Sequence, residues 1–259
     1  MKNNKLTSLL NSGKRNLLSI YATAGFPRIT DTKEIILHCQ SAGVDLMEIG
    51  IPFSDPLADG PIIQQSSQQA LDNGMTLKLL FEQILEIKSK VKIPLLLMGY
   101  YNSILRFGVE AFCQECQKSG VSGLIIPDLP LDVYQSELKE LFTKNHLHNI
   151  LLITPQTSEE RILEIDKNSS AFIYAVSSAS TTGSKNGITD ATAFLKKLKQ
   201  MNLKNPVLTG FNISDRESYL QACKYTRGAI IGSSFIKALS KSASIENNIQ
   251  SYIQLIFTK

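Results

Sequence analysis

The chain has 259 residues, of which 43% are hydrophobic and 19% charged, and it carries a net charge of +4 at pH 7. This composition can bury a sizeable core and argues against wholesale disorder. The positive charge is spread along the chain without a basic run, so a nucleic-acid surface is not indicated. Lys14 and Arg15 interrupt the N-terminal apolar stretch before a signal peptide could form, and no segment approaches the ~20 apolar residues of a membrane span. We therefore expect a cytoplasmic protein.

Short apolar runs alternate with segments of helical character along the chain. The expected strands are Leu17–Ala22, Val44–Ile49, Pro94–Met98, Leu124–Ile126, Ile150–Thr154, Phe172–Val176, Val207–Thr209 and Ala229–Ile231. Most are apolar at consecutive positions, which is typical of parallel strands covered on both faces. Eight strands alternating with helices, without a linker, predict a single α/β domain over residues 1–259, a (β/α)8 TIM barrel. The alternative is an open doubly wound sheet, but no GxGxxG follows the first strand.

Helix boundaries are marked by capping residues and glycines. Three residue pairs have capping-box spacing shortly after a strand: Asp31 with Glu34, Thr157 with Glu160, and Ser214 with Glu217. Gly43 and Gly120 stand where helices should end. Helices outside the barrel repeat are expected at Lys5–Ser12, Thr76–Lys90 and Ile245–Phe257.

The cysteines and histidines are weak candidates for a metal or redox site. Cys113 and Cys116 form a CxxC pair, but they also share one helix face with Val109 and Phe112, and no second ligand pair exists. We expect both thiols to pack against the sheet. His146 and His148 have no neighbouring cysteine or carboxylate cluster, so we assign them to a surface loop rather than to a metal site.

Glu48 is the first candidate for a catalytic residue. It lies near the carboxyl end of the second expected strand, with apolar neighbours on both sides. Burying a charged carboxylate is costly unless the group is paired or becomes neutral through a raised pKa. An internal hydrogen-bonded pair is one interpretation. Because barrel active sites lie at the carboxyl ends of the strands, we favour a carboxyl that moves protons near pH 7.

The loop after this strand, from Ile51 to Pro61, contains three prolines, which restrict its conformation. Asp55 precedes a proline and is expected to form a turn. Asp59 is followed by Gly60, and spacing alone favours a turn there as well over a catalytic role.

The string MEIGIPFSDPLADGPIIQ, which contains Glu48 and Asp59, closely resembles the signature of tryptophan synthase α subunits. The resemblance extends through Leu18–Pro27, Pro94–Asn102, Ile125–Pro130, Tyr174–Gly183, Gly210–Ser214 and Gly228–Ser233. It implies a lyase that cleaves indole-3-glycerol phosphate to indole and D-glyceraldehyde 3-phosphate in tryptophan biosynthesis, with Glu48 and Asp59 as the catalytic carboxylates. By this resemblance, Glu48 handles protons at ring carbon 3 and at the side-chain hydroxyl, while Asp59 pairs with the ring N–H.

The resemblance also implies which residues bind the substrate. The phosphate cradle comprises Thr182, Gly183, Asn212, Gly232 and Ser233, in agreement with the general use of the last βα loops of such barrels for phosphate. The indole pocket comprises Tyr21, Tyr100, Ile153, Tyr174 and Phe211, although any of these could instead be barrel core.

Two segments depart from the family pattern. The family commonly has GVTG where this chain has Ser180-Thr-Thr-Gly183, and GFGIS where it has Gly210-Phe-Asn-Ile-Ser214. Because Asn adopts the left-handed conformation more readily than most residues, we expect activity to be retained.

Family membership implies a partner. Such α subunits bind a β subunit in an α2β2 complex, and the β subunit carries pyridoxal phosphate and receives indole through a tunnel. We therefore expect this chain to bind a phosphorylated small molecule without a metal or organic cofactor of its own. Two other functions remain open: another phosphate-binding barrel enzyme, against which the ordered signature argues, and a catalytically silent subunit that only activates its partner.

Overall fold

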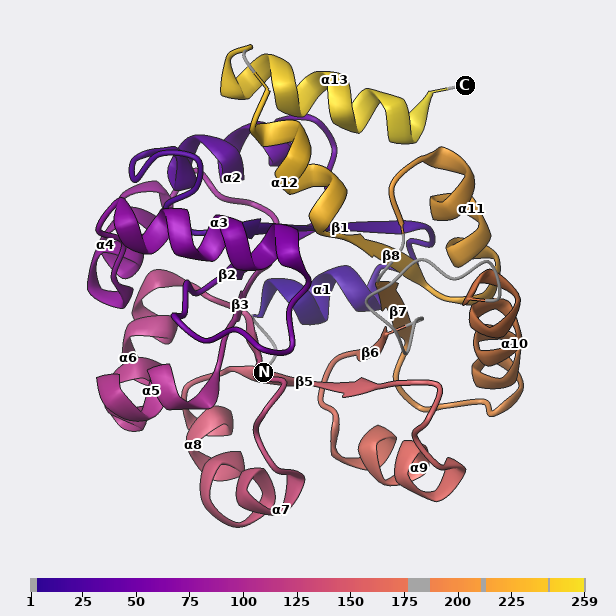
Figure 1. The fold of residues 1–259 in the computed structure, drawn as a ribbon. Coiled ribbons are helices and arrows are strands. Elements are labelled where there is room, and N and C mark those ends of the chain that lie inside the picture. Colours follow the sequence, from indigo (N-terminus) through magenta and orange to yellow (C-terminus); the bar gives the residue numbers. More distant parts are fainter. Residues whose placement is uncertain (1–3, 177–186, 211–212, 242, 259) are drawn as a thin grey trace.

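The structure, a computed structural model, describes residues 4–176, 187–210, 213–241 and 243–258. Eight parallel strands close into a barrel in chain order, with helices around it (Figure 1). The strands are β1 (Leu17–Thr23), β2 (Leu46–Gly50), β3 (Leu95–Met98), β4 (Gly123–Ile125), β5 (His148–Ile153), β6 (Ile173–Val176), β7 (Val207–Gly210) and β8 (Gly228–Ile231). The predicted TIM barrel is confirmed, and every expected strand is present with its bounds shifted by two residues at most.

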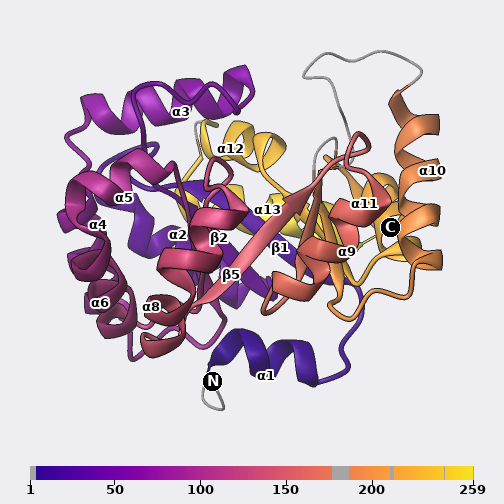
Figure 2. The same cartoon turned by 90° about the horizontal axis from the view of Figure 1, so that it is seen from below.

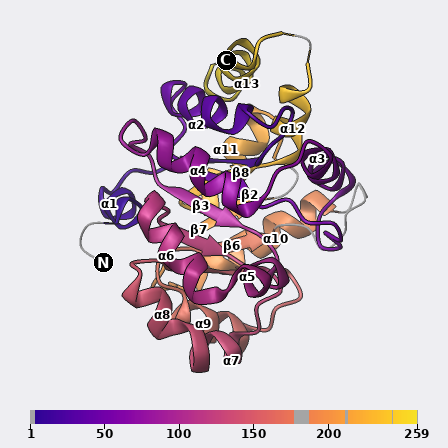
Figure 3. The same cartoon turned by 90° about the vertical axis from the view of Figure 1, so that its left-hand side faces the viewer.

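The helices form an outer layer around the barrel. Their bounds are α1 (Lys5–Asn11), α2 (Asp31–Ser41), α3 (Pro61–Asp72), α4 (Leu77–Ile87), α5 (Tyr101–Phe107), α6 (Val109–Ser119), α7 (Leu131–Val133) with a π-helical turn (Tyr134–Leu138), α8 (Lys139–Lys144), α9 (Glu159–Asn168), α10 (Gly187–Gln200), α11 (Arg216–Tyr225), α12 (Ser233–Leu239) and α13 (Ile245–Phe257). The three expected extra helices correspond to α1, α4 and α13. Helix α13 packs against α2 (Figure 3).

Helix α1 closes one end of the barrel. Figure 2 shows it apart from the ring of helices, at the end away from α3. Its Leu6 is fully buried in the same cluster as the barrel interior. We therefore expect the active site at the other end, where the strands finish and their βα loops converge. Among the described residues, no helix is long and apolar enough to cross a membrane.

Two of the expected capping boxes were placed one residue too early. Helix α9 is capped by Ser158, whose hydroxyl accepts from the Arg161 N–H, and α11 by Asp215, which forms a reciprocal box with Ser218. Asp31, the third candidate, is the first residue of α2, and its carboxylate accepts from the Arg28 side chain. The cause is simple: neighbouring Ser, Thr and Asp side chains compete for the same free N–H groups.

The cysteine prediction is confirmed, and half of the histidine prediction is wrong. Cys113 and Cys116 are fully buried in α6, in one core cluster with β3 residues such as Leu95 and Leu97. His146 is exposed, as expected. His148 instead lies on β5 and is buried, with its ring nitrogens hydrogen-bonded to Thr7 Oγ1 (2.7 Å) and Ser170 Oγ (3.1 Å). Its polar ring is accommodated in the core because both nitrogens have partners.

The barrel interior changes from apolar to polar along its axis. A cluster of apolar side chains fills it, with members on the strands or directly before them: Leu17, Leu46, Leu96, Ile125, Ile150, Phe172, Leu208 and Ile230. On β1 the same face continues through Ser19 to Tyr21, because side chains alternate along a strand. The strand register places Tyr21 opposite Glu48 of β2. The polar groups are thus brought together toward the carboxyl ends of the strands.

Gly50 at the end of β2 makes room for the ring of Tyr21. A Cβ at position 50 would lie 2.0 Å from Tyr21 Oη and 2.5 Å from Cζ. We expect Gly50→Ala to lower the free energy of unfolding by about 1–3 kcal/mol through overpacking, as measured by urea denaturation. Gly60→Ala is the control, since no atom lies within 4 Å of its Cβ position. Equal losses in the two variants would show that steric conflict with Tyr21 is not the cause.

Candidate active site

Glu48 is a fully buried carboxyl group on β2. Its Oε1 accepts a hydrogen bond from Ser19 Oγ over 2.8 Å, whereas Oε2 has no partner among the described residues. Burial raises the pKa of Glu48 from 4.5 to about 8, because the charged form loses its hydration. The group is therefore mostly neutral at pH 7 and close enough to its pKa to give and take a proton. The burial expected from the sequence is confirmed.

Asp59 lies on the loop between β2 and α3, which Tyr100 holds in place. The Tyr100 hydroxyl donates to Asp59 Oδ2 over 3.1 Å and accepts from the Ala58 N–H over 3.0 Å. The Tyr100 ring stacks on Phe53 of the same loop, with centroids 5.0 Å apart. Asp59 also closes a turn through its N–H to the Pro56 carbonyl. Asp59 can therefore form a turn through its main chain and still present its carboxylate to the site.

The Asp59 carboxyl is partly withdrawn from solvent, which raises its pKa. The hydrogen bond from Tyr100 opposes this rise, because it stabilises the charged form. The two carboxyls therefore differ: Glu48 is enclosed in the barrel with a single donor, and Asp59 lies at the mouth on a loop. Such unlike environments allow a neutral and a charged carboxyl to coexist.

Tyr21 and Tyr174 are the two aromatic side chains that line the site and lie near both carboxyls. Tyr174 is buried and Tyr21 half-buried, and burial together with Glu48 and Asp59 raises the pKa of both phenols, which stay neutral. Gly210 leaves room for Tyr174, since a Cβ there would lie 2.4 Å from Tyr174 Oη. Tyr21 and Tyr174, two of the residues predicted for the indole pocket, therefore lie at the site.

A cavity of about 420 Å³ opens at this end of the barrel. Its lining comes from several βα junctions and includes Tyr21, Asp59, Met98, Tyr174, Ile213, Gly232, Ser233, Ser234 and Lys237. The Asp59 carboxylate belongs to the loop after β2, and Gly232 and Ser233 to the junction between β8 and α12. This volume is in the range of small-molecule sites, and the lining combines apolar side chains with polar groups such as Asp59, Ser233 and Lys237.

The remaining predicted site residues divide into two groups. Thr182, Gly183, Phe211 and Asn212 lie outside the described residues. Ile153 is fully buried in the core cluster between strands and helices and does not line this cavity. Alternation explains its place: Ile150 belongs to the interior cluster of the barrel, so Ile153, an odd number of positions away, faces outward.

Two further residues belong to this region, although the sequence alone did not single them out. Lys237 follows Ser233 by four positions on α12, a spacing that places both on one helix face. Ser19 precedes Tyr21 by two positions on β1, so both face the interior. The helical spacing from Ser233 could have indicated Lys237, and the strand alternation from Tyr21 could have indicated Ser19.

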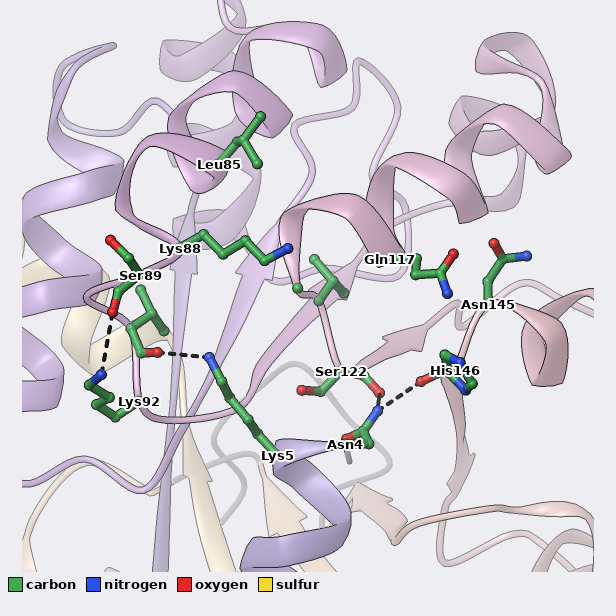
Figure 4. Close-up of a pocket in the computed structure, with 13 residues that line it drawn as sticks. Asn4, Lys5, Leu85, Lys88, Ser89, Lys92, Gln117, Ser122, Asn145 and His146 are labelled. Atoms are coloured by element: carbon green, nitrogen blue, oxygen red, sulfur yellow. Dashed lines mark hydrogen bonds between the residues drawn. The ribbon is translucent and has the colours of Figure 1, made fainter. Parts of the chain in front are cut away.

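A larger cavity, of about 890 Å³, lies at the opposite end of the barrel (Figure 4). It is lined by residues that precede strands, and it contains three lysines. Each ammonium group donates to a main-chain carbonyl: Lys5 to Val91, Lys88 to Lys118 and Lys92 to Ser89. The three ammonium groups bind different main-chain carbonyls and do not point to a common ligand position. The candidate active site is therefore the smaller cavity.

Comparison with known proteins agrees with this geometry. A sequence model of a family described as "Tryptophan synthase alpha chain" matches residues 7–258. A protein of this name from Flavobacterium psychrophilum is 53% identical over 255 residues, which cover 98% of this chain and 100% of the relative. One from Karelsulcia muelleri is 46% identical over 98% of this chain and 99% of the relative. The chain belongs to the tryptophan synthase alpha chain family.

Solved structures of tryptophan synthase have the same fold. The alpha subunit from Legionella pneumophila superimposes with a TM-score of 0.88 at 26% identity, covering 98% of this chain and 97% of that one. A chain of the aminoacrylate-bound enzyme from M. tuberculosis gives 0.85 at 26% identity, with 98% of both chains covered. As a member of this family, the protein is a lyase subunit of tryptophan biosynthesis, and the family implies a β-subunit partner.

Tyr100→Phe is expected to lower the catalytic rate of the chain about tenfold. The variant keeps the stacked ring but loses the hydroxyl that donates to Asp59 and accepts from Ala58, and such bonds are each worth about 1–2 kcal/mol. Steady-state kinetics would show the loss. Tyr101→Phe, at the adjacent position, is the control and should remain within twofold. An equal loss in both variants would contradict the assigned contact.

Proposed function

We propose that this chain catalyses the retro-aldol cleavage of indole-3-glycerol phosphate to indole and D-glyceraldehyde 3-phosphate. The observation that carries the proposal is a pair of carboxyls at the carboxyl end of the barrel. One is enclosed, with a pKa of about 8, and the other is held by Tyr100 at the edge of a cavity. The reaction needs these two properties: a group that exchanges protons, and a negative charge beside the ring nitrogen.

Glu48 exchanges the protons in this proposal. Its neutral form protonates carbon 3 of the indole ring, and the resulting carboxylate accepts the proton of the side-chain hydroxyl as the C–C bond breaks. Glu48 then returns to its neutral state, so protons balance over one turnover. A pKa near the working pH makes both transfers feasible.

Asp59 stabilises the charge that this protonation creates. Adding a proton to carbon 3 leaves positive charge around the indole nitrogen, and a fixed carboxylate beside the ring N–H lowers the energy of that state. Tyr21 and Tyr174 provide apolar ring faces in the same cavity. No metal or organic cofactor takes part in these steps.

The phosphate group is assigned to the junction between β8 and α12. Gly232 and Ser233 line the cavity there, and Thr182, Gly183 and Asn212 complete the cradle by family resemblance. Lys237 adds a positive charge to the same cavity wall, which favours an anionic substrate group.

The proposed partner is a tryptophan synthase β subunit in an α2β2 complex, with pyridoxal phosphate bound only by the β subunit. Indole passes directly from this chain to that partner. The loop that carries Asp59 supports such an interface, because its Leu57 is 89% exposed only two residues away. An apolar side chain this exposed is well suited to burial against another protein.

A product assay tests the proposed reaction. The purified chain, incubated with indole-3-glycerol phosphate, should release indole and glyceraldehyde 3-phosphate in equal amounts. A panel of other phosphorylated barrel substrates serves as the comparison. Faster turnover of any of these would overturn the proposal in favour of a different phosphate-binding barrel enzyme.

A further inference from the structure

Ser19 and Glu48 form a polar pair inside an otherwise apolar barrel. Both side chains are fully buried, on the paired strands β1 and β2. Leu17 and Leu46, two positions before them on the same strands, belong to the apolar interior cluster. An Ala side chain would satisfy packing at position 19 without a polar atom, so packing does not explain the hydroxyl. Its hydrogen bond to the Glu48 carboxyl does.

This hydrogen bond makes the two oxygens of Glu48 unequal. Oε1 accepts from Ser19 Oγ over 2.8 Å, and Oε2 is buried without a partner among the described residues. A neutral carboxyl has its proton on one oxygen, and its carbonyl oxygen is the better acceptor, so a hydrogen bond donated by Ser19 Oγ favours Oε1 as the carbonyl oxygen. The exchangeable proton of Glu48 therefore lies on Oε2.

We infer that Ser19 is a positioning residue that selects Oε2 of Glu48 as the oxygen exchanging protons with the substrate. This inference rests on the proposed function of Glu48. In the forward reaction, the Oε2–H bond breaks as the C–H bond at carbon 3 forms. Oε2 then takes the hydroxyl proton as the C–C bond breaks, while Oε1 keeps its bond from Ser19 throughout.

Ser19 also lowers the basicity of Glu48. Its hydrogen bond favours the charged carboxylate and so opposes the rise in pKa caused by burial. The other titratable groups around Glu48 are Tyr21 on β1, Tyr174 on β6 and Asp59 on the loop after β2. The phenols stay neutral because their own pKa values are raised. Removing the Ser19 hydroxyl should therefore raise the pKa of Glu48 further.

The test is a ¹³C NMR titration of the glutamate carboxyls, together with the pH dependence of kcat, in the parent chain and in Ser19→Ala. The Glu48 signal is identified by its loss in Glu48→Gln. We expect the Glu48 pKa and the matching limb of the kcat profile to move together to higher pH, by about one unit. KM should stay within twofold, because Ser19 is fully buried and does not line the cavity. Ser19→Cys, of similar size but a weaker donor, should give an intermediate shift.

Two results would overturn the inference: an unchanged Glu48 pKa in Ser19→Ala, or a shifted pKa without a shift in the kcat profile. In particular, a lower kcat with neither the Glu48 titration nor the pH profile of kcat shifted would show that Ser19 acts only on folding. Failure of the proposed function has a different signature, because Glu48→Gln would then release indole at the parent rate. Such a rate would overturn both the proposed function and the inference.

Discussion

Asp59→Asn is expected to lower the rate of indole release from indole-3-glycerol phosphate by about 10²–10³-fold. The amide has the size of the carboxyl and can still meet the Tyr100 hydroxyl. It lacks the negative charge that stabilises the protonated indole ring. Substrate affinity, measured by calorimetry, should remain close to that of the parent chain, because the charge is needed only as the ring becomes positive.

Asp55→Asn is the matched control for this variant. Asp55 lies on the same loop, is exposed and hydrogen-bonds with the neighbouring Ser54 hydroxyl. In the isolated chain its amide variant should retain activity within a few fold. Loss of equal size in both variants would assign the effect to the shape of the loop, and near-normal turnover of Asp59→Asn would remove Asp59 from the mechanism.

Glu48→Gln is expected to reduce the same rate by about 10²–10⁴-fold, the usual contribution of a general acid–base group. Gln has nearly the same shape, and its amide oxygen can accept from Ser19, so the barrel should stay folded. Substrate binding should be largely intact. Turnover near that of the parent chain would show that Glu48 is a structural carboxyl whose raised pKa has no catalytic use.

The same variant should change how stability depends on pH. The pKa of Glu48 is about 8 in the folded chain and 4.5 when unperturbed, so between these values the folded state holds a proton that the unfolded state releases. The stability contributed by the neutral carboxyl is fully present below pH 4.5 and is lost as pH rises toward about 8.

Gln cannot titrate, so Glu48→Gln should become more stable relative to the parent chain by about 3–4 kcal/mol between pH 5 and pH 8. Urea denaturation at the two pH values measures this difference. Glu34→Gln, an exposed carboxyl on α2, is the control and should follow the parent chain. A Glu48→Gln curve parallel to that of the parent chain would contradict the burial of a neutral carboxyl.

The fold could be predicted well because its signals are local and repeated. Consecutive apolar residues between helical segments located every strand to within two residues. Cap assignments were less accurate, since Thr157 and Ser158 both carry hydroxyls and only the path of the chain decides which one caps α9. His148 was misplaced because its burial depends on Thr7 and Ser170, which are distant in sequence.

The candidate site was only partly accessible to physical reasoning from the sequence. Glu48 stood out because an acidic residue inside an apolar strand is costly. Asp59 did not, because Asp followed by Gly is common in turns, and its contact with Tyr100 spans 41 positions. Ser19 could not be singled out for the same reason: a small polar residue in a strand gains significance only from the Glu48 carboxyl on the neighbouring strand, 29 positions away.

The most direct test of the account is the rate of indole release from indole-3-glycerol phosphate by the purified chain, with and without a tryptophan synthase β subunit. We predict slow release by the chain alone and a large acceleration by the partner, with both rates lowered about 10²–10³-fold in Asp59→Asn. Absence of indole under both conditions would contradict the account. The chain would then be a silent subunit that only activates its partner.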